Sequence, residues 1–321
     1  MFNTYEVSFS TNEVNDEFKT YVAENGSFVR CLNVPSNDTV SIGIDLSVYP
    51  ITASPSGIHF IPTGLHFLYI SSTNCPVVQS FFHFFEQSTF LEIMWKEDTI
   101  TTTVSSCNSP LDFEKASSFC YPLHLYKSWL EFSFVISKNV CQDFNLTYST
   151  LLFSDQYLST SLSFPNVSKL PLALKPFSPS ERSRLALDQS WRLEALWSSS
   201  FPSSLFGQLQ SCFILFYLGQ CFDGLVQWIN VLELISQSQS FLIKYSAPLL
   251  RVLKSHLEFL KQVGDDSLFF TNSSERSLPQ CLSRIRSVLV ENKSICPVVD
   301  ELFEFFSEDD EEDFLVVDDL N

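Results

Sequence analysis

Apolar and polar residues follow a two-residue period in several short runs of the first third of the chain. In the clearest run Leu91, Ile93 and Trp95 alternate with Glu92 and Lys96, as in a strand with one face on a core. Other runs are rich in β-branched and aromatic residues and cover residues 27–34, 58–61, 65–70, 81–85 and 99–104. The pattern predicts an antiparallel β domain in which residues 99–104 pair with residues 90–95.

The apolar positions change to helical spacing at Tyr121, and residues 122–137 fit one helix entered through its proline. Further on, Ser178, Pro179 and Glu181 give a start signal, since the serine can cap a helix and the glutamate can reach back to the cap amide. Apolar steps of three and four residues then predict helices at about residues 179–201, 205–218, 222–235, 242–263 and 275–290. Residues 205–218 are apolar nearly all round, so we expect this helix to be the central buried one.

The fold class predicted from these patterns is α+β, with four parts along the chain. An antiparallel β domain that includes the helix near residues 122–137 occupies residues 1–153. A Ser- and Pro-rich linker follows at residues 154–178, and an α-helical bundle or short superhelix at residues 179–299. The last part, residues 300–321, is an acidic tail that we expect to be disordered.

The tail carries eleven acidic residues and no basic one. Such a charge run does not fold alone. Within it lies an apolar island formed by Phe314, Leu315, Val316 and Val317. We interpret the island as a segment that adds a strand to the edge of a partner's sheet, while the flanking carboxylates steer it toward a basic surface. The alternative is that the tail docks on its own chain or only aids solubility.

Composition limits the classes of protein to consider. The chain is 45% hydrophobic, so its 321 residues can bury a core in each of two domains. A net charge of −18 argues against direct binding to nucleic acid or to an anionic membrane. The nine cysteines include no Cys-x-x-Cys pair, which indicates reduced thiols in the cytoplasm or nucleus. Neither a signal peptide nor a membrane span is expected from the sequence.

Residues 40–72 concentrate the positions that specify backbone geometry. Three of the eight glycines lie here, namely Gly43, Gly57 and Gly64, each where a strand must bend or let another backbone approach. Pro62 and Gly64 supply turn chemistry, and we expect the runs on either side, residues 58–61 and 65–70, to pair with each other. Asp45 and His66 are the two ionisable residues of the stretch that we single out.

No catalytic, cofactor or metal motif is recognised in the sequence. The cysteines and five histidines form no zinc pattern, and no phosphate-binding, dinucleotide-binding or nucleophile-elbow motif is present. His66 is interpreted as a satisfied core or rim histidine. A hydrolase that uses Asp45 and His66 remains an alternative, and it requires both side chains to converge in one pocket.

The stretch at residues 40–72 also has a specific order of residues: G-I-D, a spacer of about a dozen residues, then G-I-x-x-I-P-x-G-x-H-F followed by a pair of serines. It is carried by Gly43, Ile44, Asp45, Gly57, Ile61, Pro62, Gly64, His66, Phe67, Ser71 and Ser72. This order resembles the signature of the AAR2 family of splicing factors. Thr63 stands where the family has a second proline, and Tyr49 where it has a tryptophan.

The resemblance extends from about residue 22 to residue 299 and implies a C-terminal domain similar to VHS-type helical domains. It implies a non-enzymatic assembly chaperone of the U5 small nuclear ribonucleoprotein, present in cytoplasm and nucleus. Family members bind the RNase H-like and Jab/MPN domains of the Prp-eight scaffold protein and delay its association with the Brr-two helicase. In the family a strand of the C-terminal tail bridges those two domains. The VHS-like helices leave a cargo or lipid adaptor as a further alternative.

Overall fold

The computed structural model describes most of the chain in two compact units. Unit 1 comprises Met1–Phe164 and Gln210–Leu225, and unit 2 comprises Pro165–Leu209 and Val226–Asn321. The described residues are 14–35, 39–51, 56–72, 78–96, 99–106, 117–146, 152–153, 164–165, 167, 178–198, 200–263 and 278–306.

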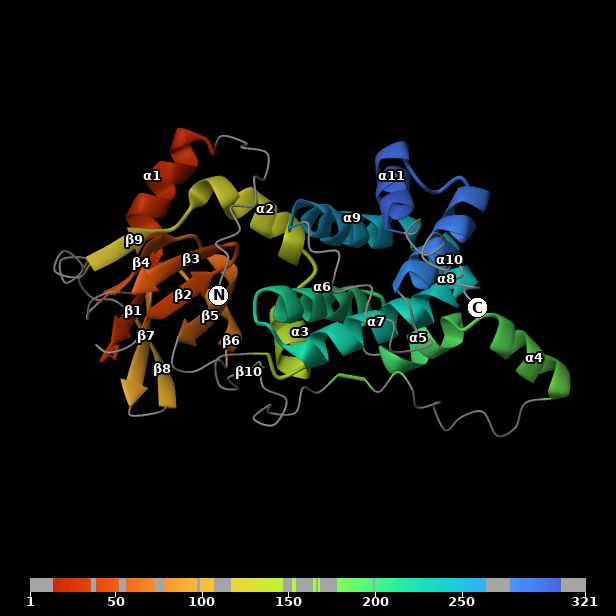
Figure 1. Ribbon diagram of the computed structural model, residues 1–321, viewed down its shortest axis with the longest axis horizontal. Coiled ribbons are helices and arrows are strands. Elements are labelled where there is room, and N and C mark those ends of the chain that lie inside the picture. Colours follow the sequence, from red (N-terminus) through yellow and green to blue (C-terminus); the bar gives the residue numbers. More distant parts are fainter. Residues whose placement is uncertain are drawn as a thin grey trace, which may run out of the picture. The chain divides into compact units, whose positions relative to one another are not determined.

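Unit 1 contains two five-stranded sheets (Figure 1). The first has the order β8-β7-β1-β4-β9 and the second the order β10-β6-β5-β2-β3. The strands are β1 (Ser27–Leu32), β2 (Val40–Ile44), β3 (Ser47–Ile51), β4 (Ser56–Ile61), β5 (Gly64–Ser72), β6 (Gln79–Phe85), β7 (Thr89–Lys96), β8 (Thr99–Ser106), β9 (Ser117–Cys120) and β10 (Leu152–Phe153). Both sheets contribute to one hydrophobic core, which includes Val29 of β1 and Ile42 of β2.

The pairing of β7 with β8 confirms one predicted strand pair. The second sheet is antiparallel throughout. In the first sheet β1 pairs with β7, and β4 with β9, in the parallel direction, so this sheet is mixed.

The predicted pairing of residues 58–61 with residues 65–70 is wrong. Strand β4 pairs with β1 and β9, whereas β5 pairs with β2 and β6 in the other sheet. The turn at Pro62 and Thr63 therefore carries the chain from one sheet to the other. Pro62 and Gly64 correctly indicated a turn, but turn residues do not specify which strands pair. Strand pairing depends on side-chain packing against cross-strand neighbours.

Three helices complete the N-terminal part of unit 1. They are α1 (Asp16–Asn25), α2 (Leu123–Ser133) and α3 (Lys138–Asp143). Helix α1 is capped by Asn15, whose side chain accepts a hydrogen bond from the Phe18 amide. The single helix predicted near residues 122–137 is wrong in its extent. Helix α2 ends at Ser133, and Ser137 caps the start of α3.

Helices α6 (Ser203–Tyr217) and α7 (Phe222–Ser236) contribute residues to both units. Residues 204–215 of α6 are all buried, which confirms the expectation for this helix. Residues 210–225, which the sequence pattern groups with the helical domain, belong to unit 1. There the ring of Phe213 packs against Phe132 of α2, and the Gln210 side chain accepts a hydrogen bond from the Val135 amide.

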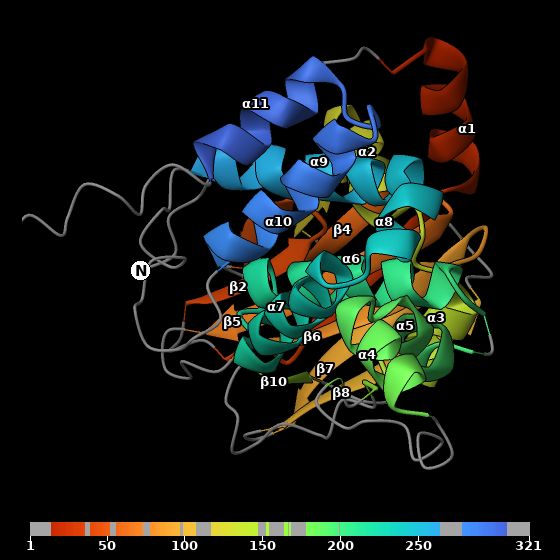
Figure 2. The ribbon, with the colours of Figure 1, turned by 90° about the vertical axis from the view of Figure 1, so that its right-hand side faces the viewer.

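The other helices belong to unit 2 (Figure 2), where α11 packs against α9 and α10, and α10 packs against α8. They are α4 (Pro179–Leu187), α5 (Ser190–Leu196), α8 (Gln239–Lys244), α9 (Ser246–Val263), α10 (Leu278–Glu291) and α11 (Pro297–Phe305). The predicted start at Ser178 is confirmed, including both bonds of its capping box with Glu181. The order of a β-rich part followed by helices confirms the α+β class.

Three further helix predictions need correction. The helix expected over residues 242–263 is divided at Tyr245 into α8 and α9. The helix expected over residues 179–201 is interrupted at Asp188, which bonds to the starts of two other helices. Residues 300–305, predicted to belong to the disordered tail, form most of α11. Here an apolar face with Leu302 and Phe303 is buried, and Arg286 of α10 pairs with Asp300 at 2.6 Å and with Glu304. These contacts offset the acidic charge that suggested disorder.

Replacing Asp188 with alanine should lower the stability of unit 2 by about 2 kcal/mol. Its carboxylate accepts bonds from the Ser190 amide at 3.0 Å and the Ser190 hydroxyl at 2.5 Å, at the start of α5. It also accepts bonds from the Ser240 amide at 3.2 Å and the Ser240 hydroxyl, in the first turn of α8. Urea unfolding measures the loss. Asp188→Asn, which keeps one acceptor, should lose less, and equal losses would contradict this account.

Candidate functional site

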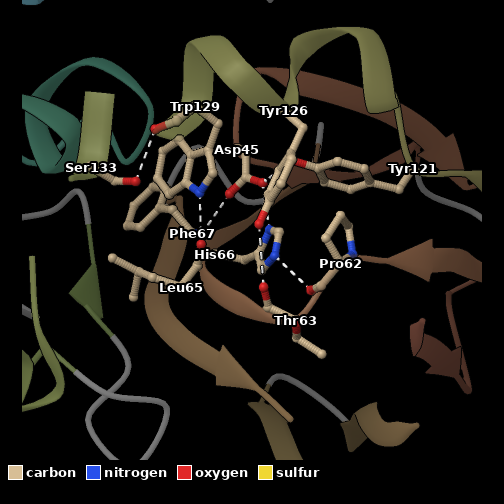
Figure 3. Close-up of polar contacts among 10 residues, drawn as sticks. All are labelled: Asp45, Pro62, Thr63, Leu65, His66, Phe67, Tyr121, Tyr126, Trp129 and Ser133. Atoms are coloured by element: carbon tan, nitrogen blue, oxygen red, sulfur yellow. Dashed lines mark hydrogen bonds and ion pairs between the residues drawn. The ribbon is translucent and has the colours of Figure 1, made fainter. Parts of the chain in front are cut away.

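Asp45 forms the centre of a buried polar network in unit 1 (Figure 3). It lies in the turn between β2 and β3 with φ at 51°, a conformation that aspartate tolerates better than most residues. One carboxylate oxygen accepts the Phe67 amide at 2.8 Å. The other accepts the Tyr121 hydroxyl at 2.7 Å and faces Nδ1 of His66 at 2.6 Å. The Asp45 amide in turn donates to the Phe67 carbonyl, so the turn is held to β5.

His66 has an acceptor at each ring nitrogen. Its Nδ1 faces the Asp45 carboxylate, and its Nε2 lies 2.9 Å from the Pro62 carbonyl oxygen. A carbonyl oxygen can only accept, so Nε2 carries a proton and donates to Pro62. Nδ1 and the Asp45 carboxyl group share a short hydrogen bond. The pair is buried, with side-chain exposures of 0% and 2%.

Tyr121 is fixed as a donor by its surroundings. Burial raises its pKa well above the usual value, and the negative charge of Asp45 raises it further. The hydroxyl therefore keeps its proton throughout the physiological range. Its ring also lies edge-on to the His66 ring, with centroids 5.3 Å apart.

Helix α2 covers the network and is tied to the segment that joins the two sheets. The indole Nε1 of Trp129 donates to the Leu65 carbonyl at 2.6 Å, and the Tyr126 hydroxyl donates to the Thr63 carbonyl at 3.3 Å (Figure 3). Trp129 is fully buried. The hydrogen bonds thus join the β2–β3 turn, the crossover at residues 62–65 and helix α2.

The glycines of the signature serve close packing and turn geometry. A Cβ on Gly43 would lie 2.0 Å from the Tyr69 ring, and one on Gly57 would lie 2.1 Å from the Val29 carbonyl oxygen. Gly64 has φ at 133°, which side chains rarely adopt. The structure therefore brings Asp45, Pro62 and His66 into one network, places Gly64 beside it, and puts Gly43 and Gly57 at separate points of close strand contact.

The hydrolase alternative required Asp45 and His66 to converge, and they do. A general base must also reach a substrate proton. Here both ring nitrogens of His66 are engaged by the protein itself, and neither side chain is exposed to solvent. The arrangement fixes a hydrogen-bonded Asp45–His66 pair in the interior, which holds the β2–β3 turn and the Pro62 crossover together.

Tyr121, Tyr126 and Trp129 are the members of the site that the sequence did not indicate. Their helical spacing marked Tyr126 and Trp129 only as apolar positions. The apolar island at residues 314–317 lies outside the described residues. Within the described part, no group of three or more potential metal ligands is found, and no helix is long and apolar enough to cross a membrane.

The fold and the buried network define a two-unit α+β protein. Asp45, Pro62 and His66 of the signature make their contacts inside the protein itself. Two family models match nearly the whole of it: the AAR2 N-terminal domain over residues 25–145 and the AAR2 C-terminal repeat region over residues 164–314. The chain belongs to the AAR2 family.

Relatives in several animals agree with this assignment. The chain is 24% identical over 238 residues to the protein AAR2 homolog of Oryctolagus cuniculus, a match that covers 69% of this chain and 68% of the relative. It is 23% identical over 296 residues to the Mus musculus homolog, covering 74% and 76%. The Homo sapiens homolog is 22% identical over 281 residues, covering 68% and 71%.

Proposed function

We propose that this chain is a non-enzymatic assembly chaperone of the U5 small nuclear ribonucleoprotein in pre-mRNA splicing. In this role it binds the RNase H-like and Jab/MPN domains of the Prp-eight scaffold protein and delays the Brr-two helicase, in cytoplasm and nucleus. The observation that carries the proposal is the family match over both units. The buried network supports it, because the residues that make the signature distinctive hold the fold together and leave recognition to surfaces.

The proposed mechanism is capture at two points. A surface of the folded units engages one partner domain, and the island at residues 314–317 pairs with a sheet edge of the other. Burying two alternate side chains of the island contributes roughly 3 to 6 kcal/mol, most of which is offset by ordering about six residues. The tail alone therefore binds weakly, but tethering it to the first contact raises its effective concentration.

Removing residues 313–321 should weaken binding to the Prp-eight domain pair by at least about tenfold, which corresponds to about 1.4 kcal/mol. Two matched variants of the intact tail separate its parts. Serine at the four island positions should reproduce the loss, whereas amides at the neighbouring carboxylates should mainly slow association and weaken its salt dependence. Isothermal titration and stopped-flow fluorescence measure both effects. Unchanged affinity after the truncation would refute the tail's role.

Capture from cell extract with a tagged chain, followed by mass spectrometry, tests the proposed partner. Enrichment of Prp-eight and other U5 proteins is the expected result. The adaptor alternative predicts instead that the chain sediments with liposomes, which the net charge of −18 disfavours. Recovery on vesicles without U5 proteins would replace the proposal with that alternative.

A further inference from the structure

A cysteine and a histidine meet at the edge of the first sheet. Strands β4 and β9 run parallel, and His59 and Cys120 are register partners at the ends of their paired segment. The Cys120 Sγ lies 3.1 Å from His59 Nε2. Among the described strands, β9 is an edge strand of its sheet, and Cys120 is exposed.

The exposure of Cys120 separates it from most other cysteines. Of the seven cysteines in the described residues, only Cys120 and Cys296 are exposed. Burial raises the pKa of Cys31 and of Cys141 to about 12, which makes those thiols unreactive. Cys120 combines access from solvent with a neighbouring imidazole, and this combination favours reaction with electrophiles.

The backbone fixes both members of the pair. The Tyr121 amide donates to the His59 carbonyl at 2.9 Å, and the Tyr49 hydroxyl donates to the Cys120 carbonyl at 3.1 Å. Partial burial lowers the pKa of His59, so its imidazole is neutral at pH 7. Its Nε2 faces the thiol, while its buried Nδ1 has no hydrogen-bond partner among the described atoms.

We propose that Cys120 is a redox modification site of this protein, at which the thiol exchanges with small disulfides such as oxidised glutathione. The thiol proton passes to His59 Nε2 as Sγ attacks one sulfur of the disulfide. The Sγ–S bond forms while the original S–S bond breaks, and the released thiolate takes the proton from the imidazole. Cys120 is thereby oxidised to the mixed disulfide and one glutathione is reduced to its thiol, so no further oxidant is needed. The product is a mixed disulfide at an exposed position of the edge strand.

The intact chain allows a direct test. Oxidised glutathione is added at pH 7 to the folded chain and to the chain unfolded in urea, and each cysteine is followed by peptide mass spectrometry. We expect Cys120 to react at least about tenfold faster in the folded chain. Buried Cys212 should react more slowly in the folded chain, which confirms that folding was retained. Equal or slower reaction of Cys120 on folding would overturn the proposal.

A pair of matched variants tests the part of His59. His59→Leu should slow Cys120 about tenfold and leave Cys296 unchanged. His124→Leu removes an exposed histidine from α2 and should change neither rate. Circular dichroism and thermal unfolding identify any loss of fold. A folded His59→Leu chain in which Cys120 reacts as fast as before would refute the role of the imidazole.

Discussion

Replacing Asp45 with asparagine should lower the free energy of unfolding of unit 1 by about 3 to 5 kcal/mol, because it breaks the fully buried Asp45–His66 pair by removing one partner. Asparagine keeps the shape of the side chain and tolerates the φ of 51° at this position. The loss therefore reports the electrostatics of the network. Hydrogen exchange of peptides from β5, followed by mass spectrometry, measures the effect within unit 1.

Two control variants show whether the Asp45–His66 pair is the cause. Tyr121→Phe removes one hydrogen bond to the same carboxyl group and should cost only about 1 kcal/mol. The double variant Asp45→Asn with His66→Leu removes both members of the pair and should be more stable than Asp45→Asn alone. A cost of Asp45→Asn no larger than that of Tyr121→Phe would show that the pair does not stabilise unit 1.

Mild acid should destabilise unit 2 through His256, and His256→Leu should remove much of that sensitivity. His256 is fully buried in α9, edge-on to the Trp228 ring with centroids 5.9 Å apart. Burial lowers its pKa from 6.5 to about 3. Between these values the unfolded chain binds a proton that the folded chain does not, so stability is complete above pH 6.5 and falls as pH decreases. The slope is about 1.4 kcal/mol per pH unit and the full loss is about 5 kcal/mol.

Urea unfolding at several pH values between 7 and 4 measures this dependence. The intact chain should lose stability steadily below pH 6.5, whereas His256→Leu should lose it with a slope smaller by about 1.4 kcal/mol per pH unit. His124→Leu removes an exposed histidine and serves as the control, with the slope of the intact chain. Identical slopes for all three chains would show that His256 is protonated in the folded state.

Local patterns predicted the elements whose signals are local. The alternation around Leu91 to Trp95 marked β7, and the capping residues at Ser178 marked the start of α4. The pairing of β5 and the formation of α11 depend on contacts with residues far away in the sequence. The hairpin expected between β4 and β5 does not form, because β5 pairs with β2 and β6 instead. Helix α11 formed within an acidic stretch because Arg286, at least fourteen residues earlier, pairs with two of its carboxylates.

The candidate site was predicted in part. The signature singled out Asp45 and His66, but their roles depend on Tyr121, which is separated from Asp45 by 76 positions. No periodicity indicates such a contact, since the tyrosine precedes a helix and the aspartate follows a strand. The parallel pairing of β4 with β9, which brings His59 to Cys120, was likewise invisible because β9 has only four residues.

Binding of the purified chain to the purified RNase H-like and Jab/MPN domains of Prp-eight tests the central claim most directly. Isothermal titration of the domain pair into the intact chain should give saturable binding that weakens when either partner domain is omitted. Absence of heat and of co-migration in gel filtration, with both proteins folded, would contradict the account and leave the family match without its proposed function.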